Sequence, residues 1–341
     1  MEKNTRVKAR VKAHALKEFM NTKEKVVVMG HRLPDADSFG AAIGIYRAAK
    51  TLNKKAYIVI DNPTSSIIPL MNTFRDNQDY EADMFVNNHE AKEIMDDNTL
   101  LVVVDTNKPS ITQCEDLLYM AKMIVVLDHH RQGSDTIRNS VLSYIEPYAS
   151  SASEMVAEIL QYFTEGIRIR NVEADSIYAG IMIDTDNFMQ KTGVRTFEAA
   201  AFLRRCGADV TRVRKLFRED MNDYKARGET IRNAELFRGQ FAISECPSDY
   251  VDSPTVVGAQ AANELLNIVG VKASFVLTEY KGVIYISARA IDEVNVQIIM
   301  ERMGGGGHLN MAGCQLETVN MEGARNLLKS TLTEMQDGGE I

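Results

Sequence analysis

Four apolar segments of this sequence end directly in aspartate or histidine, the side chains that most often bind cations and transfer protons. Parallel strands end at one edge of their sheet, so polar residues that follow them are expected to lie close together. The sequence therefore predicts one polar site assembled from distant segments. The residues are His31, Asp35 and Asp37 after 26–29, Asp105 after 101–104, Asp128, His129 and His130 after 124–127, and Asp184 after 180–183.

This set of side chains suits a pair of divalent cations, which needs oxygen ligands, some imidazole and a carboxylate that contacts both ions. Such ligation favours Mn²⁺ and also accepts Mg²⁺ or Co²⁺, whereas Zn²⁺ would favour thiolates. A lone aspartate at a strand end more often caps a turn, so the hypothesis depends on the whole set. We predict that one ion binds His31 and Asp35, the other binds Asp37, His129 and Asp184, and both share Asp105.

The composition is that of a globular protein, with 45% hydrophobic and 25% charged residues among 341 and a net charge of -8. The acidic charge argues against binding long nucleic acids, which requires a basic surface. The four cysteines form no C-x-x-C pair, as expected for a reducing, cytoplasmic compartment. No apolar run approaches the roughly 18 residues that cross a bilayer, so we expect no membrane contact by this chain itself.

Segments typical of strands and helices alternate through about residue 150, which predicts an α/β fold with a parallel sheet covered by helices. A capped helix is predicted to start at Ser151, with Glu154 completing a capping box. The next helix is predicted to end near Asp184. The predicted strands are 26–29, 56–60, 101–104 and 124–127.

The C-terminal part predicts a smaller α/β domain. Residues 273–289 have the pattern of a β-hairpin with Lys281 and Gly282 at the turn, and a helix follows over 294–303. Residues 1–20 predict a solvated basic lead-in helix, or else the continuation of an upstream segment. We expect a lead-in at 1–20, a first domain at 21–210, a helical connector at 211–239 and a second domain at 240–341, with the active site in the cleft between the domains.

A glycine run near the C-terminus is a candidate substrate-binding element. Without Cβ atoms, a backbone can approach an anion closely and direct several N–H groups toward it, although such a run can also be only a flexible helix end. A neighbouring histidine would add a donor, and an arginine a charge-assisted hydrogen bond. The candidates are Gly305, Gly306, Gly307, His308 and Arg289.

The chain resembles the DHH phosphoesterases, which take their name from the triplet found here as Asp128-His129-His130. The resemblance covers nearly the whole chain and extends to the DHH-associated domain, marked by 304–308 and by Ala312-Gly313. Within this superfamily the sequence is most similar to the catalytic module of membrane-anchored cyclic-di-AMP phosphodiesterases, through residues 5–10 and 184–200.

The resemblance implies the six metal ligands predicted above. It also implies a catalytic role for His130, at the scissile phosphate or the leaving oxygen, and a supporting role for Asp128, since such carboxylates orient a ligating imidazole. Asp186 departs from the pattern as an extra acid near the metals.

The resemblance further implies hydrolysis of cyclic di-AMP to linear pApA. Cyclic di-GMP is expected to be a poorer substrate, the protein a homodimer, and the chain a soluble fragment of a membrane-anchored parent. One alternative is an oligoribonuclease or adenosine-bisphosphate phosphatase of the same superfamily. Another is a nucleotide sensor without catalysis, which would be expected to lack one or more ligands.

Overall fold

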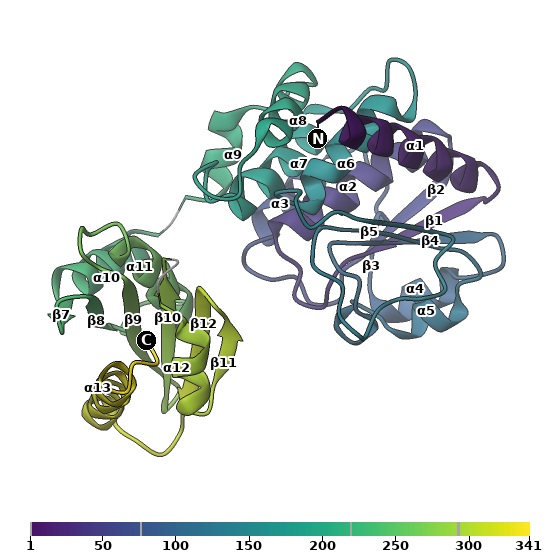
Figure 1. The fold of residues 1–341 in the computed structure, drawn as a ribbon. Coiled ribbons are helices and arrows are strands. Elements are labelled where there is room, and N and C mark those ends of the chain that lie inside the picture. The colour runs from purple at the N-terminus through teal and green to yellow at the C-terminus, as the bar shows by residue number, and fades with distance from the viewer. Residues whose placement is uncertain (1, 76, 219, 292–293) are drawn as a thin grey trace. The chain divides into compact units, whose positions relative to one another are not determined.

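The computed structural model describes residues 2–75, 77–218, 220–291 and 294–341. The chain forms two compact units, Met1–Arg218 and Glu219–Ile341. Each unit is a β-sheet covered by helices (Figure 1), which confirms the predicted α/β fold class.

The first unit contains a parallel six-stranded sheet in the order β3-β2-β1-β4-β5-β6. In the centre, Met29 of β1 pairs with Val59 of β2 and Val103 of β4, so these strands end level with one another. Burial on both faces explains why the central strands are continuous apolar runs. The strands are β1 (Lys25–Met29), β2 (Lys55–Val59), β3 (Phe85–Val86), β4 (Thr99–Val104), β5 (Ile124–Asp128) and β6 (Leu142–Ile145).

Helices cover both faces of this sheet (Figure 1). Val28 faces a core shared with α1, α2, α3, α6 and α7, whereas Val27 faces a smaller core shared with α4 and α5. The helices α8 and α9 pack on α7. The helices are α1 (Glu2–Asn21), α2 (Ala36–Thr51), α3 (Ile68–Arg75), α4 (Asn88–Ile94), α5 (Asp116–Met120), α6 (Ala152–Phe163), α7 (Asn171–Asp184), α8 (Val194–Arg205) and α9 (Val210–Leu216).

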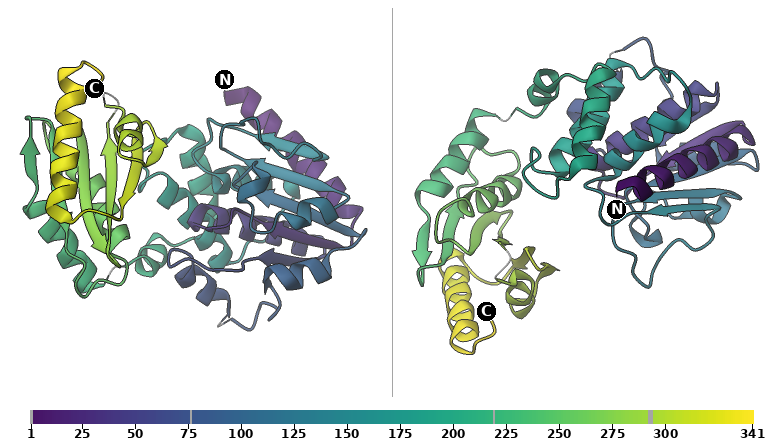
Figure 2. Two further views of the ribbon diagram at one scale, coloured as in Figure 1. Left: turned by 90° about the horizontal axis from the view of Figure 1, so that it is seen from below. Right: turned by 45° about the horizontal axis from the view of Figure 1, so that its top comes forward.

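The second unit contains a mixed sheet in the order β11-β12-β10-β9-β8-β7, in which only β8 and β9 run parallel to each other among the described strands. One face packs against α10 and α11, and the other against α12 and α13. Figure 2 shows α13 lying along the strands. The elements are α10 (Met221–Arg232), β7 (Glu235–Phe237), β8 (Phe241–Cys246), α11 (Pro254–Leu265), β9 (Ala273–Tyr280), β10 (Val283–Ala290), α12 (Val296–Arg302), β11 (Gly306–His308), β12 (Met311–Leu316) and α13 (Met321–Asp337).

Two local predictions can be compared directly with the structure. The Ser151 hydroxyl accepts a hydrogen bond of 2.9 Å from the Glu154 amide and so caps α6 as predicted, but the Glu154 carboxylate accepts from the Ser150 hydroxyl instead of completing the capping box. In the β9–β10 hairpin, Lys281 and Gly282 have φ values of 53° and 77°, the left-handed pair that a two-residue turn of this kind requires.

Three features differ from the expectations. Helix α1 is not merely solvated, because Ala13, Leu16 and Met20 recur on one face and are buried in the first core. The predicted connector 211–239 is divided between the units, with α9 in the first and α10 and β7 in the second. Part of the glycine run is not a loop but the strand β11, which pairs with β12.

Candidate metal centre

Asp105 lies at the centre of the predicted site, immediately after β4. Its side chain is 2% exposed, and its backbone has a φ of 57°, a left-handed conformation that is unfavourable outside glycine. The carboxylate faces two imidazoles at once: Oδ2 lies 3.2 Å from Nε2 of His31, and Oδ1 lies 3.3 Å from Nε2 of His129. This is the arrangement expected of a carboxylate shared between two cations.

The first group of candidate ligands contains His31, Asp35 and Asp105, whose ligand atoms lie within 4.8 Å of one another. Nε2 of His31 is 3.5 Å from Asp35 Oδ2, and Asp35 also caps α2 by accepting a hydrogen bond from the Ser38 amide. Burial alone would lower the pKa of His31, but the two carboxylates outweigh it and raise the pKa to about 10. The surroundings therefore strongly favour a cation at this position.

The second group contains Asp37, His129 and Asp184. Nε2 of His129 lies 3.7 Å from Asp37 Oδ2 and 3.8 Å from Asp184 Oδ2. Burial raises the pKa of Asp37, and the neighbouring charges of Asp105 and Asp184 raise it further. Burial also raises the pKa of Asp184, against the opposing charge of His129. Around His129 the buried Asp37 and Asp105 and the half-buried Asp184 thus bring three carboxyl groups to one imidazole, and only Asp105 also faces His31.

The position of Asp37 depends on the start of α6. Its two carboxylate oxygens accept hydrogen bonds of 2.7 Å from the Ala152 amide and 2.8 Å from the Ser153 amide. These amides belong to the first turn of the helix, where backbone N–H groups lack helical partners and favour negative charge. The first turn of α6 therefore binds the carboxylate of Asp37, a residue of α2.

Close packing of α2, α6 and α7 makes this contact possible. A Cβ on Gly180 of α7 would lie 2.2 Å from Ser153 Oγ and 3.0 Å from Ala36 O. A Cβ on Gly40 of α2 would lie 2.6 Å from Ser176 O. Both glycines therefore let the helices that contribute Asp37 and Asp184 approach the start of α6.

The residues present fit divalent cations. Asp105 Oδ1 and Asp184 Oδ2 are buried without a hydrogen-bond partner, a costly state that a bound cation would relieve. The six predicted ligands are rich in oxygen, with one imidazole in each of the two groups described above, as hard divalent cations prefer. The structure thus brings all six predicted ligands together.

His130 forms a third group of possible ligands with Asp105 and His129, and its Nδ1 lies 3.7 Å from Asp105 Oδ1, but its nearest partner is Asp128. Its Nδ1 is 2.8 Å from Asp128 Oδ1, while its side chain is 58% exposed. Burial would raise the pKa of Asp128, but hydrogen bonds from His130 and Asn107 hold it below its usual value. An ionised carboxylate only accepts hydrogen bonds, so the His130 proton sits on Nδ1 and Nε2 is left for another partner. Asp128 thus orients the His130 imidazole in these contacts.

Asn107 was not predicted from the sequence. Its amide donates a 2.5 Å hydrogen bond to Asp128 Oδ2 and a 3.4 Å hydrogen bond to the His130 carbonyl oxygen. The available signal was its place two residues after Asp105, at the same strand end. Asp186, by contrast, is exposed and accepts a hydrogen bond from Gln190, and it belongs to none of the candidate ligand groups among the described residues.

The remaining candidates lie in the second unit. Arg289 of β10 is half-buried and donates a 2.9 Å hydrogen bond from Nε to Asn263 Oδ1. Cβ atoms on Gly305 and Gly307 would lie 2.1 Å and 2.5 Å from backbone atoms of β12, so strand packing by itself requires these glycines. On the short strand β11, Gly306 is half-buried with no atom within 4 Å of its Cβ position, and His308 is exposed.

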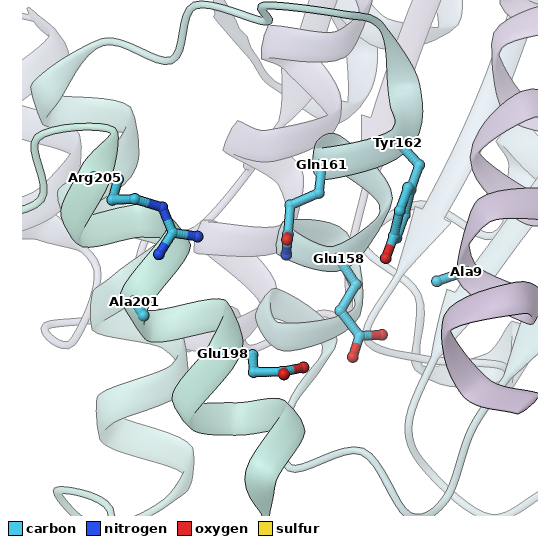
Figure 3. Close-up of a pocket in the computed structure, with 7 residues that line it drawn as sticks. All are labelled: Ala9, Glu158, Gln161, Tyr162, Glu198, Ala201 and Arg205. Atoms are coloured by element: carbon cyan, nitrogen blue, oxygen red, sulfur yellow. The ribbon is translucent and has the colours of Figure 1, made fainter. Parts of the chain in front are cut away.

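A pocket of about 280 Å³ opens between α1, α6 and α8 of the first unit (Figure 3). Its lining includes Glu158 and Arg205 but none of the predicted site residues. Both carboxylate oxygens of Glu158 accept 2.7 Å hydrogen bonds from the Arg195 guanidinium. This ion pair joins α6 to α8, so we assign it to helix packing.

Comparison with family models places the chain in a known class. The DHH family N-terminal domain matches residues 25–181, and the DHHA1 domain matches residues 241–334. The chain therefore belongs to the DHH family, a metal-dependent family, as the triplet at residues 128–130 predicted.

The chain is also similar in sequence to individual proteins of known activity. The chain is 44% identical to the cyclic-di-AMP phosphodiesterase GdpP of Bacillus subtilis, over 99% of this chain and 52% of that protein. It thus spans about half the length of this relative. It is 24% identical to the bifunctional oligoribonuclease and PAP phosphatase NrnA of Thermus thermophilus, over 93% of this chain and 92% of that protein.

The fold has a counterpart among solved structures. An exopolyphosphatase-related protein from Bacteroides fragilis superposes with a TM-score of 0.79 at 20% identity, covering 96% of this chain and 97% of that one. In the described part of the chain, no helix is long and apolar enough to span a membrane.

Proposed function

We propose that this chain is the catalytic part of a phosphodiesterase that opens one phosphodiester bond of cyclic di-AMP to give linear pApA. The observation that carries the proposal is the placement of Asp105 between the imidazoles of His31 and His129. The similarity to GdpP supports the choice of substrate.

The metal ligands follow from the two groups of side chains. In this proposal His31 and Asp35 would hold one cation, and Asp37, His129 and Asp184 would hold the other. Asp105 would contribute to both sites. When bound, the pair of cations supplies a water of lowered pKa and offsets charge on the phosphoryl oxygens. We propose Mn²⁺ as the preferred metal, with Mg²⁺ or Co²⁺ as substitutes, because the donors are mainly oxygen.

His130 is proposed to act on the scissile phosphate. With Nδ1–H donating to Asp128, its exposed ring presents Nε2 to a bound phosphodiester or to the leaving oxygen. Asn107 holds the other oxygen of the same carboxylate and so keeps Asp128 from rotating. Asp128 and Asn107 are positioning residues in this scheme.

The second unit is proposed to contribute substrate contacts through Arg289, Gly305, Gly306, Gly307 and His308. We further propose that the chain acts in the cytoplasm as a homodimer and belongs to a membrane-anchored parent protein. The support for a parent protein is the greater length of GdpP.

The test is a Mn²⁺-dependent hydrolysis assay with cyclic di-AMP, cyclic di-GMP, pApA and pyrophosphate. Cyclic di-AMP is expected to be cleaved fastest, with pApA as product. Asp105→Asn is expected to reduce the rate by at least about 100-fold, because it removes a charge shared by both ligand groups. Asp186→Asn is the matched control and should retain the wild-type rate. Full activity of Asp105→Asn would contradict the proposal.

The same assay, with adenosine bisphosphate added as a fifth substrate, separates the alternative functions. Faster turnover of pApA or adenosine bisphosphate would favour the oligoribonuclease or phosphatase activity named for NrnA. A sensor without catalysis would bind the nucleotide and cleave none of these substrates. The presence of all six candidate ligands in the two groups argues against such a sensor.

A further inference from the structure

The second unit contains a pocket that the proposed catalytic groups do not account for. Its volume is about 430 Å³. It lies entirely within this unit and is bordered by the start of α11, by the strands β10 and β12 and by the turn before β11. The lining residues that matter here are Thr255, Tyr285, Ser287, Gly305, Gly313 and Gln315.

The pleat of the sheet explains why polar side chains line this pocket. Tyr285 pairs with Gln315 and Ser287 pairs with Gly313 across β10 and β12, so these four residues share one face. The alternate residues, including Ile286, point to the opposite face and are buried with α12 and α13.

Helix α11 covers a neighbouring part of this same face. It packs mainly on β9, where Gly258 permits close approach because a Cβ there would lie 2.4 Å from Thr278 Oγ1. Thr255, in the first turn of α11, reaches the border of the pocket. Because α11 leaves the polar face of β10 and β12 uncovered, the pocket lies there, next to the part of the sheet that the helix covers.

The chemistry of the lining favours an uncharged planar ligand. The side chains offer a phenol, two hydroxyls and a carboxamide, and none of the residues described as lining the pocket is charged. A phosphate would require cationic donors, whereas a nucleobase needs a stacking surface and neutral hydrogen-bonding groups. Arg289 follows two residues after Ser287 on the same face of β10, where a phosphate attached to the base would meet a positive charge.

The carboxamide of Gln315 gives this pocket a basis for selecting adenine. A glutamine amide group donates to N7 of adenine while its oxygen accepts from the N6 amine. Guanine and hypoxanthine present acceptors at both positions, so the amide oxygen would face another oxygen.

We propose that this pocket binds an adenine base, with Tyr285 stacking on the ring and Gln315 reading its N6 and N7 edge. The identity of the complete ligand as cyclic di-AMP rests on the proposed function above. The pocket and its preference for adenine do not depend on the metal centre.

The proposal is tested by titrating the full chain with adenosine and with inosine in the presence of EDTA, and following binding by NMR. These nucleosides lack phosphate, and the chelator removes catalysis, so only base recognition is measured. Adenosine is expected to bind with millimolar affinity and more tightly than inosine.

Two variants distinguish the proposed edge contact of Gln315 from the proposed stacking of Tyr285. Gln315→Leu is expected to weaken adenosine binding about 10-fold and to leave inosine nearly unchanged, because it removes the edge contacts. Tyr285→Ala is expected to weaken both nucleosides about 10-fold, because it removes the stacking surface. Tyr148→Ala, at a tyrosine that is 92% exposed in the first unit, is the matched control.

Adenosine binding that is absent from the wild type, or equal in wild type, Gln315→Leu and Tyr285→Ala, would overturn the assignment. Thermal unfolding of each variant identifies any loss of folding, and Gln315 is exposed, so its replacement should leave the fold intact. Failure of the proposed function has a different signature: adenosine binds as expected, but cyclic di-AMP is not cleaved when Mn²⁺ is restored.

Discussion

The contacts of individual side chains in the first unit distinguish candidate metal ligands from residues that position another side chain. The ligand candidates place oxygen and nitrogen atoms toward one another, whereas Asp128 turns away to His130 and Asn107. A ligand candidate should therefore affect metal affinity, and Asp128 should affect the chemical step.

This division predicts the behaviour of Asp128→Asn. The variant is expected to lower kcat about 10–100-fold, because the neutral amide holds the His130 imidazole less firmly. The dissociation constant for Mn²⁺ should stay near the wild-type value, because Asp128 is in none of the candidate ligand groups among the described residues. Asp37→Asn is the comparison and should weaken Mn²⁺ binding. Steady-state kinetics and a Mn²⁺ titration measure the two quantities, and a parallel loss of Mn²⁺ affinity in Asp128→Asn would contradict the assignment.

At the scale of elements, the site depends on the close approach of α2, α6 and α7. The start of α6 donates two amides to Asp37, and Gly180 keeps α7 close to Ser153 of that same turn. Helix packing and metal ligation should therefore fail together when this approach is prevented.

Gly180→Ala tests this connection. The new methyl group would meet Ser153 Oγ and Cβ at 2.2 Å and 2.9 Å, so the helices must separate. We expect a loss of about 1–3 kcal/mol in the free energy of unfolding, the usual cost of overpacking, and weaker Mn²⁺ binding. Gly228→Ala in α10 is the control, since a Cβ there meets no atom within 4 Å. Chemical denaturation compares the two, and an unaltered Gly180→Ala protein would exclude the packing argument.

The contact between α2 and the segment before β3 predicts a pH dependence. Burial would raise the pKa of Glu81, but hydrogen bonds from Lys50 and Tyr46 outweigh it and lower the pKa to about 2. A carboxyl group with a depressed folded-state pKa stabilises the fold above its unfolded value, and this contribution is lost as the pH falls toward 2.

Glu81→Gln should therefore be less stable than wild type at about pH 6, and the difference should shrink as the pH approaches about 3. Urea unfolding at both pH values measures the difference. A constant difference between the two proteins would show that the charge of Glu81 is not responsible.

Four strands of the first sheet were predictable because each is a short, largely apolar run, as in β4 and β5. The strand β6 was missed because a polar, exposed residue interrupts its four-residue apolar pattern. The strand β3 was missed because it has only two residues. Burial of α1 was missed because part of its buried face consists of alanines, which carry little hydrophobic signal. Strand β11 was missed because a glycine run is atypical of strands.

At the scale of the whole molecule, the sequence indicated two α/β parts and the class of reaction, since the ligand candidates directly follow predicted strands or end a predicted helix. The family matches in the two units agree with that division. What the sequence could not indicate depends on tertiary contacts: the amides of α6 at Asp37, the contact of Asn107 with Asp128, and the pocket beside α11.

The central claim is that Asp105 joins two cation sites. Its most direct test is a crystal structure of the full chain grown with Mn²⁺, with anomalous scattering used to locate the metal. Two anomalous peaks about 3.5–4 Å apart are expected, one beside His31 and one beside His129, with Asp105 contacting both. A single peak, peaks remote from Asp105, or no peak beside these residues would contradict the account.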